Sequence, residues 1–202
     1  MRLCEIKQTS PERFTLVFDD ASELKTTLGT ITERFLHSGM ELSGEAYNEL
    51  VCASTLSLAK ARALRIINAR PMSREEMRKR LVEKGETPEN AEECADWLCE
   101  MGLINDEQYA GSVVRHYAAK GYGQTRIKQE LRRHGVPREM WDAALEQMPE
   151  QDEYLARFLR TRLSDPTDRA QVKKVSDALF RRGYSWEQIR SALNEFDTQG
   201  EL

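Results

Sequence analysis

The strongest constraint on the fold of this chain is a spacing pattern that occurs three times. In each case an apolar residue is followed four positions later by Leu, and four positions after that by Gly. Apolar residues four apart share one face of a helix, and a glycine beyond the helix allows the left-handed turn that ends it. The pattern therefore predicts three helical repeats. The three sets are Met77, Leu81 and Gly85; Ile127, Leu131 and Gly135; and Val175, Leu179 and Gly183.

Each glycine is followed by a second apolar series at its sixth, tenth and thirteenth positions, which indicates another helix. A further apolar face precedes each set, at residues 63–67, 109–118 and 154–159. Each repeat is therefore expected to hold three helices. We predict a mainly α-helical chain in which three such units form a curved array, at residues 58–104, 105–150 and 151–202. The post-glycine series are Ala91, Ala95 and Leu98; Trp141, Leu145 and Met148; and Ile189, Leu193 and Phe196.

Helix-start signals stand at the expected places. Asn105 precedes the first helix of the second repeat, and asparagine is among the best N-cap residues. The sequences "SREE" from Ser73 and "SWEQ" from Ser185 fit the capping box, and Thr87 is followed by Pro.

Residues 1–57 have a different pattern. "RLCEIKQT" and "RFTLVFD" are short, alternating and rich in β-formers, so they predict a hairpin, and "SELKTTL" could add a third strand. "TITERFLHSG" predicts a short helix that ends at Gly39, and Ser43 is expected to cap another helix that runs to about Ser54. This segment either covers the first repeat or contacts a partner, and the sequence leaves both roles open.

The composition argues against an enzyme and against a metal protein. The four cysteines show no C-x-x-C pairing, so we expect no disulfide and no metal site, and they are interpreted as buried or partly buried apolar residues. His37, His116 and His134 are isolated, and no nucleophile, base and orienting acid occur together. No apolar run approaches the length of a membrane span. We therefore expect a cytoplasmic protein without catalytic residues or cofactors.

Charge is sorted along the repeats, although residues 58–202 sum to zero. Residues 60–84 hold nine basic and three acidic residues, whereas residues 85–107 hold eight acidic and no basic residues. The same alternation follows: residues 115–138 hold seven bases against one acid, and residues 139–156 hold six acids and no base. Such sorting gives a low net charge with a strong local field.

Two interpretations of the sorted charge remain open. The basic helices could present a track for a phosphate backbone or an acidic protein groove, or they could form ordinary surface ion pairs of little energetic worth. The second repeat holds most of the candidate contact residues, around the buried positions Ile127 and Leu131. The candidates are Arg78, Arg115, Lys120, Arg126, Lys128, Arg132, Arg133, Arg138, Arg181 and Arg182.

The central block contains the motifs "GLINDEQYA", "KGYGQTRIKQEL" and "RRHGV". With these motifs it resembles the RecX family, which regulates the bacterial RecA recombinase. The likeness extends to "ALRIINARPMSREEMRKRLVEKG", which is similar to the family's first unit. It covers residues 58–148 well and the third repeat more loosely. Gln124 departs from the pattern, because the family often has Pro after the Gly-x-Gly turn. The matched motif residues, all assigned to architecture, are Asn105, Asp106, Gly121, Gly123, Leu131 and Gly135.

The resemblance implies a function that the residue patterns alone do not give. RecX proteins are non-enzymatic regulators in DNA repair, homologous recombination and the SOS response. They bind RecA, lodge in the groove of its filament on DNA, restrain ATP hydrolysis and strand exchange, and limit filament extension. We therefore expect RecA and its filament as partners, with weak direct binding to DNA, no association with a membrane, and a monomer. One alternative is a stand-alone helical nucleic-acid-binding protein, against which the net charge of −4 argues. Another is a structural scaffold for a different protein, which the sorted charge also permits.

Overall fold

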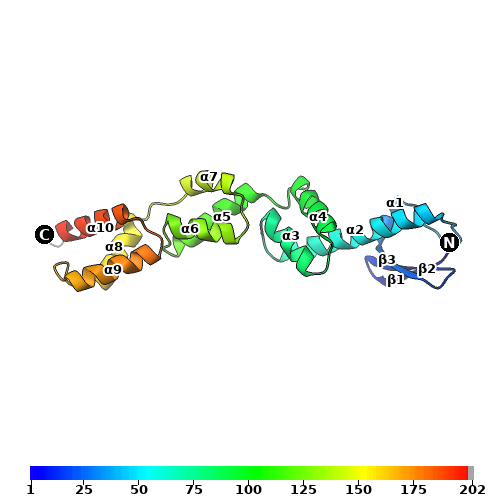
Figure 1. Cartoon of the computed structure of the whole chain (residues 1–202), viewed down its shortest axis with the longest axis horizontal. Coiled ribbons are helices and arrows are strands. Elements are labelled where there is room, and N and C mark those ends of the chain that lie inside the picture. The colour runs from blue at the N-terminus through cyan, green and yellow to red at the C-terminus, as the bar shows by residue number, and fades with distance from the viewer. Residues whose placement is uncertain (200–202) are drawn as a thin grey trace. The chain divides into compact units, whose positions relative to one another are not determined.

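The computed structural model describes residues 1–199, and it contains one small sheet followed by helices (Figure 1). The last three residues of the predicted third repeat lie outside this range. The chain forms two compact units: residues 1–71 with 75–104, and residues 72–74 with the chain from 105 onward. The elements are β1 (Leu3–Ser10), β2 (Arg13–Phe18), β3 (Glu23–Thr27), α1 (Leu28–Glu33), α2 (Gly44–Ala69), α3 (Arg74–Glu83), α4 (Pro88–Glu100), α5 (Asp106–Ala119), α6 (Gln124–Arg133), a 3₁₀ turn (Arg138–Met140), α7 (Trp141–Glu146), α8 (Asp152–Arg162), α9 (Arg169–Arg181) and α10 (Trp186–Gln199).

The N-terminal segment forms a three-stranded antiparallel sheet in the order β1-β2-β3. The hairpin and the third strand are therefore confirmed. Leu3, Leu16 and Phe18 are buried against Leu50 of α2. The buried hydroxyl of Ser54 donates to the Thr26 hydroxyl over 3.0 Å, which ties α2 to β3.

Two helix ends differ from the prediction. The helix capped by Ser43 does not stop near Ser54 but continues to Ala69, because Ala59, Ala63 and Ile67 extend its buried face. α1 ends at Glu33, before Phe35 takes a positive φ of 50°. The predicted stop, Gly39, instead donates its amide to the Leu3 carbonyl over 2.7 Å, beside the sheet.

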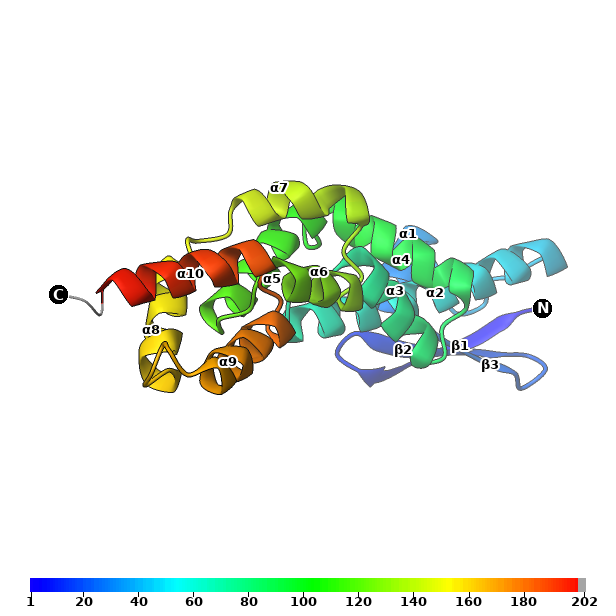
Figure 2. The ribbon, with the colours of Figure 1, turned by 60° about the vertical axis from the view of Figure 1, so that its left-hand side comes forward.

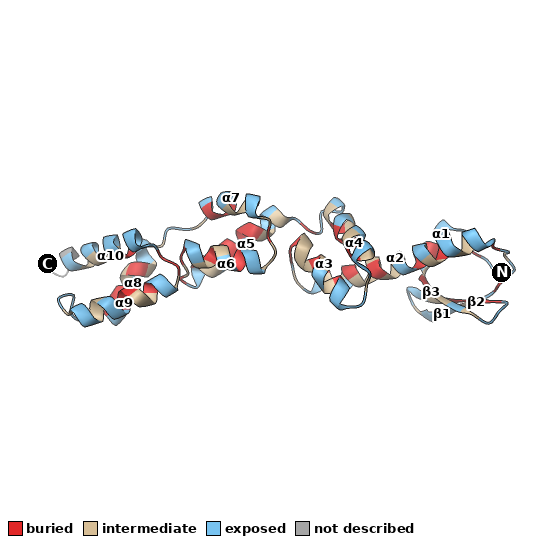
Figure 3. Ribbon diagram, in the orientation of Figure 1, coloured by how far each residue is buried: buried red, intermediate tan, exposed pale blue. Residues whose placement is uncertain are grey.

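The three repeats have the predicted helices, and their apolar anchors are buried (Figure 3). The three stop glycines have φ values between 70° and 93°. In each repeat the carbonyl of the anchor leucine accepts the amide of the residue after the glycine, over 3.0 to 3.3 Å. This is the Schellman bond, so one leucine both fills the core and closes the helix. The accepting leucines are Leu81, Leu131 and Leu179.

Three of the four predicted caps are confirmed, and the hydroxyl of the fourth, Ser73, donates to the His134 carbonyl over 2.6 Å. The Asn105 side chain accepts the amide of Gln108, and Thr87 accepts that of Asn90. Ser185 and Gln188 make the reciprocal pair of a capping box, at 3.2 and 3.0 Å. The cysteine interpretation holds for Cys94, which is buried, and for Cys99, which is half-buried. It is wrong for Cys4 and Cys52, which are exposed.

In the second unit, the second and third repeats meet at the Gly-Tyr-Gly turn. Figure 2 shows α8, α9 and α10 grouped beside one another in the third repeat. Gly123 donates its amide to the Arg182 carbonyl over 2.9 Å, and Thr125 donates to the Gly183 carbonyl over 3.1 Å. A Cβ at Gly123 would lie 2.6 Å from the Tyr184 amide nitrogen, and one at Gly121 would overlap the Tyr154 ring. These two glycines therefore allow the repeats to approach closely.

Candidate partner-binding surface

The basic helix α6 carries a buried carboxylate, which belongs to Glu130. The Glu130 side chain is only 4% exposed, and it pairs with Arg126 over 2.9 Å and with Arg133 over 3.4 Å. These three residues lie one turn apart on the same side of the helix, at i, i+4 and i+7. Arg126 and Arg133 are both predicted contact residues, and the buried Glu130 therefore neutralises part of their charge.

His134 is not isolated in the fold, because its ring contacts two tyrosines of α5. Its Nδ1 is 3.1 Å from the Tyr109 hydroxyl, and its Nε2 is 3.5 Å from the Tyr117 hydroxyl. Burial and the neighbouring Glu130 carboxylate raise the pKa of Tyr117. The two tyrosines come from α5, so this polar cluster joins α5 to the end of α6. The Ser73 hydroxyl also donates to the His134 carbonyl over 2.6 Å, and we assign the cluster to architecture.

Two candidate bases pair with acids on the next helix of their own repeat. Arg78 of α3 lies 3.7 Å from Glu92 of α4, and Lys128 of α6 lies 3.7 Å from Asp142 of α7. Arg78 also binds Glu75 over 2.8 Å. Hydrogen bonds from Arg78 lower the pKa of the Glu75 carboxyl to about 2.

Two more candidates belong to the junction between the second and third repeats. The Arg182 guanidinium lies over the rings of Tyr122, Tyr154 and Phe158, at 5.4 to 5.9 Å from their centroids. It also donates to the Lys120 carbonyl over 3.3 Å. The Lys120 ammonium lies 5.3 Å from the centre of the Tyr117 ring. Arg182 therefore stabilises the junction through cation–π contacts.

The remaining four candidates are exposed: Arg115, Arg132, Arg138 and Arg181. Within the part of the chain that the structure describes, none of the four makes an ion pair. Arg115 donates weakly to Gln147 over 3.4 Å. The charges of these residues are accessible to a partner.

The family-motif residues occupy structural positions. Asn105 caps α5, and Asp106 accepts the amide of Arg74 over 2.8 Å, with a pKa raised by burial. Gly121, Gly123, Leu131 and Gly135 serve the helix ends and the repeat junction described above. Sequence reasoning missed the buried Glu130, although one signal marked it: it is the only acid between residues 115 and 138.

Across residues 1–199, no three His, Cys, Asp or Glu side chains gather where they could hold a metal ion. None of the described helices has both the length and the apolar character needed to span a bilayer.

Comparison with known proteins identifies all three repeats. Residues 59–98, 105–145 and 153–193 match the family models of the first, second and third three-helix domains of RecX. A curated relative, "Regulatory protein RecX" of Xanthomonas axonopodis pv. citri (strain 306), is 36% identical over 141 residues, which cover 68% of this chain and 86% of that protein. The protein of the same name from Halorhodospira halophila (strain DSM 244 / SL1) is 32% identical over 142 residues, or 69% and 88% of the two chains.

Solved structures have the same fold. A crystal structure of regulatory protein RecX superposes with a TM-score of 0.75 at 24% identity, covering 96% of this chain and 98% of that one. The crystal structure of RecX from Lactobacillus salivarius gives a TM-score of 0.64 at 26% identity, covering 72% and 99%. With its three matched domains and its similarity to proteins of that name, this chain belongs to the RecX family of regulatory proteins.

Proposed function

We propose that the protein regulates RecA by binding it and its filament on DNA, inhibiting ATP hydrolysis and strand exchange and limiting filament extension. Family membership carries this proposal, since RecX domains match all three repeats. The sorted charge supports it, because clustered bases on a chain whose net charge is −4 can bind a charged polymer locally without general attraction to DNA. We also propose that the protein acts in the cytoplasm, as a monomer and without a cofactor.

The exposed arginines are the first contact residues to test. Arg132 follows the buried Leu131 on α6, and Arg138 begins the next turn; both are exposed. Neither arginine forms an ion pair with an acid of the described chain, so both can pair with carboxylates or phosphates of a partner. Arg126 and Arg133 are weaker candidates, because they also stabilise Glu130.

The direct test is RecA's ATPase on single-stranded DNA with this protein titrated in. We expect strong inhibition at substoichiometric or near-stoichiometric amounts. Reversal of two charges, Arg132→Glu with Arg138→Glu, should weaken inhibition at least fivefold while the helical circular dichroism stays unchanged. The control with the same net charge is Lys173→Glu with Lys174→Glu, on the exposed side of α9, and it should inhibit normally. Equal loss in both double variants would show a general charge effect instead of a contact.

The same material distinguishes the alternative function. A stand-alone nucleic-acid-binding protein would bind bare DNA tightly, with a logarithmic salt slope of about 0.9 per phosphate contacted. Tight binding of that kind, together with an unchanged RecA ATPase, would replace the proposal. Weak DNA binding with strong RecA inhibition would support it.

A further inference from the structure

The third repeat lacks an ion pair that the other two repeats share. Seven residues before the stop glycine, the first two repeats have a base, and seven residues after it they have an acid. These are the pairs Arg78–Glu92 and Lys128–Asp142, each at 3.7 Å across the gap between the second and third helices. At the same two positions the third repeat has Ser176 and Arg190. The base is lost, and the acid is replaced by an arginine.

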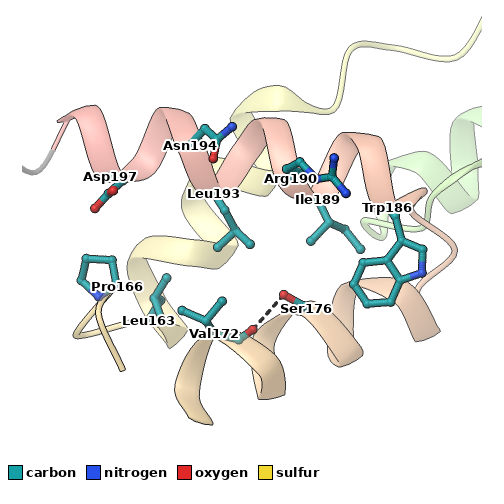
Figure 4. A pocket seen from close by; sticks show the side chains of 10 residues that line it. All are labelled: Leu163, Pro166, Val172, Ser176, Trp186, Ile189, Arg190, Leu193, Asn194 and Asp197. Atoms are coloured by element: carbon teal, nitrogen blue, oxygen red, sulfur yellow. Dashed lines mark hydrogen bonds between the residues drawn. The ribbon is translucent and has the colours of Figure 1, made fainter. Parts of the chain in front are cut away.

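A hollow of about 380 Å³ lies at this position, between α9 and α10. Figure 4 shows Ile189 and Leu193 of α10 pointing toward Leu163 and Val172 on the opposite side. Trp186 closes one end. The Ser176 hydroxyl lines the hollow while donating to the Val172 carbonyl over 2.8 Å. The volume is at the lower end of the range of ligand sites and is suited to a few apolar side chains.

The two ends of this hollow differ in charge. Arg190 lies near Trp186, whereas Asp197 lies beside Pro166 at the other end (Figure 4). Arg190 is exposed, and it forms no ion pair with any residue of the described chain. An anion is therefore favoured at the Arg190 end and disfavoured at the Asp197 end.

An exposed aromatic pair continues the surface from the Trp186 end. The rings of Phe180 and Trp186 stack with centroids 5.1 Å apart, and 51% and 52% of these residues are exposed. Aromatic side chains that remain exposed beside an apolar hollow are typical of protein-binding surfaces.

We infer that this hollow binds an acidic, apolar segment of a partner protein. A leucine-like side chain of the segment packs against the partly buried Leu193 and the exposed Trp186, and a carboxylate of the segment pairs with Arg190. The partner thereby supplies the carboxylate that Glu92 and Asp142 supply within the first two repeats. The complementary charge argues for a protein segment with both a carboxylate and an apolar side chain, since a phosphate backbone offers nothing to fill the apolar hollow. This inference does not depend on the RecA proposal.

The test uses the full-length, ¹⁵N-labelled chain and a defined probe. The probe is an acetylated and amidated peptide of two leucines followed by two glutamates, and the matched control peptide has glutamines in place of the glutamates. The chain has three tryptophans, so the indole N–H signal of Trp186 can be assigned with Trp186→Phe. We expect this signal to shift saturably as the glutamate peptide is added. The affinity for the glutamine peptide should be at least fivefold lower. The signals of Trp97 and Trp141 should stay in place.

Two sets of variants separate the site from general charge effects. Arg190→Gln should weaken binding of the glutamate peptide about tenfold, as expected for loss of a charge-assisted hydrogen bond. Lys174→Gln, on the same repeat, should leave this binding unchanged. The double variant Ser176→Lys with Arg190→Asp recreates the pair of the second repeat and should abolish the shift. The inference fails if Arg190→Gln binds like the original chain, or if both peptides bind equally. It also fails if an oligothymidylate shifts Trp186 and competes with the peptide, since the ligand would then be a phosphate.

Discussion

At the scale of single residues, the buried Glu130 sets the roles of its two arginine partners. The side chains of Arg126 and Arg133 are 42% and 74% exposed, whereas the Glu130 side chain is 4% exposed. Removing both arginines leaves the buried carboxylate without its cations, while removing the carboxylate lets the arginines turn to water. Since both arginines are partly exposed, Arg126→Gln with Arg133→Gln should lower the free energy of unfolding by about 1 to 2 kcal/mol, measured by urea denaturation.

A third substitution, at Glu130 itself, distinguishes the two possible causes of this loss of stability. Adding Glu130→Gln to the double variant removes the buried charge and should restore most of the lost stability. If the triple variant is as unstable as the double, the loss comes from packing of the arginine side chains and not from the stranded carboxylate. Because Arg126 and Arg133 stabilise the buried Glu130, charge reversal at these two positions is a poor test of partner contact.

Glu75 gives a prediction for the pH dependence of stability. Hydrogen bonds from Arg78 lower its pKa from 4.5 to about 2, so the folded state favours the ionised form. Its contribution is complete above about pH 4.5 and is lost as the pH falls toward 2. Because 34% of this side chain is exposed, solvent limits the effect to about 1 kcal/mol. Glu75→Gln should thus be less stable than the original chain at pH 7 and equal to it near pH 2, by urea denaturation. A constant difference at both pH values would contradict this assignment.

At the scale of elements, the contact between the second and third repeats depends on the absence of a side chain at Gly123. This residue has an ordinary φ of −80°, so its requirement is for space. A methyl group there would meet the backbone of Gly183 and Tyr184. Gly123→Ala should cost about 2 to 3 kcal/mol, and thermal unfolding measures the loss.

A second glycine provides the matched control. Gly85 has a φ of 90° and open space around it, so Gly85→Ala tests backbone strain alone and should cost about 1 kcal/mol. Faster hydrogen exchange at both α6 and α9 in Gly123→Ala would locate the damage at the repeat junction. An effect no larger than that of Gly85→Ala would show that the junction can separate without cost.

Local signals explain which elements could be predicted from the sequence. The stop glycines and the cap residues act on backbone groups a few residues away, so their spacing was sufficient. The full length of α2 was missed because Ser54 resembles a helix end. Its hydroxyl instead finds a partner in Thr26, on a distant strand. The left-handed residue after α1 was missed because phenylalanine carries no signal for that conformation.

The candidate surface was less predictable, because charge and exposure are independent properties. Ten bases were named from the charge sorting, and only contacts between helices distinguish Arg182, which lies over three rings, from Arg132, which is exposed. The hollow of the third repeat has a signal in the sequence. The exchange of an acid for Arg190 at equivalent repeat positions is visible in the sequence alone.

At the scale of the whole molecule, α2 joins two structures that look separate in the sequence. Its first half carries Leu50 under the sheet, and its second half carries Ala63 against the rest of the first repeat. Two bases of this second half also form ion pairs with the rest of the first repeat: Lys60 with Glu93 over 3.3 Å, and Arg62 with Glu86 over 2.6 Å. The N-terminal sheet and the first repeat are accordingly one compact unit.

This continuity predicts different outcomes for two truncations. Removing residues 1–57 cuts α2 in the middle and discards its cap at Ser43, and the short uncapped helix that remains is marginal in water. Amides of α3 and α4 should then exchange with deuterium at least tenfold faster, because α2 no longer holds α4. Amides of α6 and α9 should be unchanged, since they belong to the other unit. Removing only residues 1–42 keeps the cap and the whole helix, so α3 and α4 should lose far less protection. Equal exchange in the two truncated chains would mean that α2 is not the element that supports the first repeat, and that the sheet itself must be.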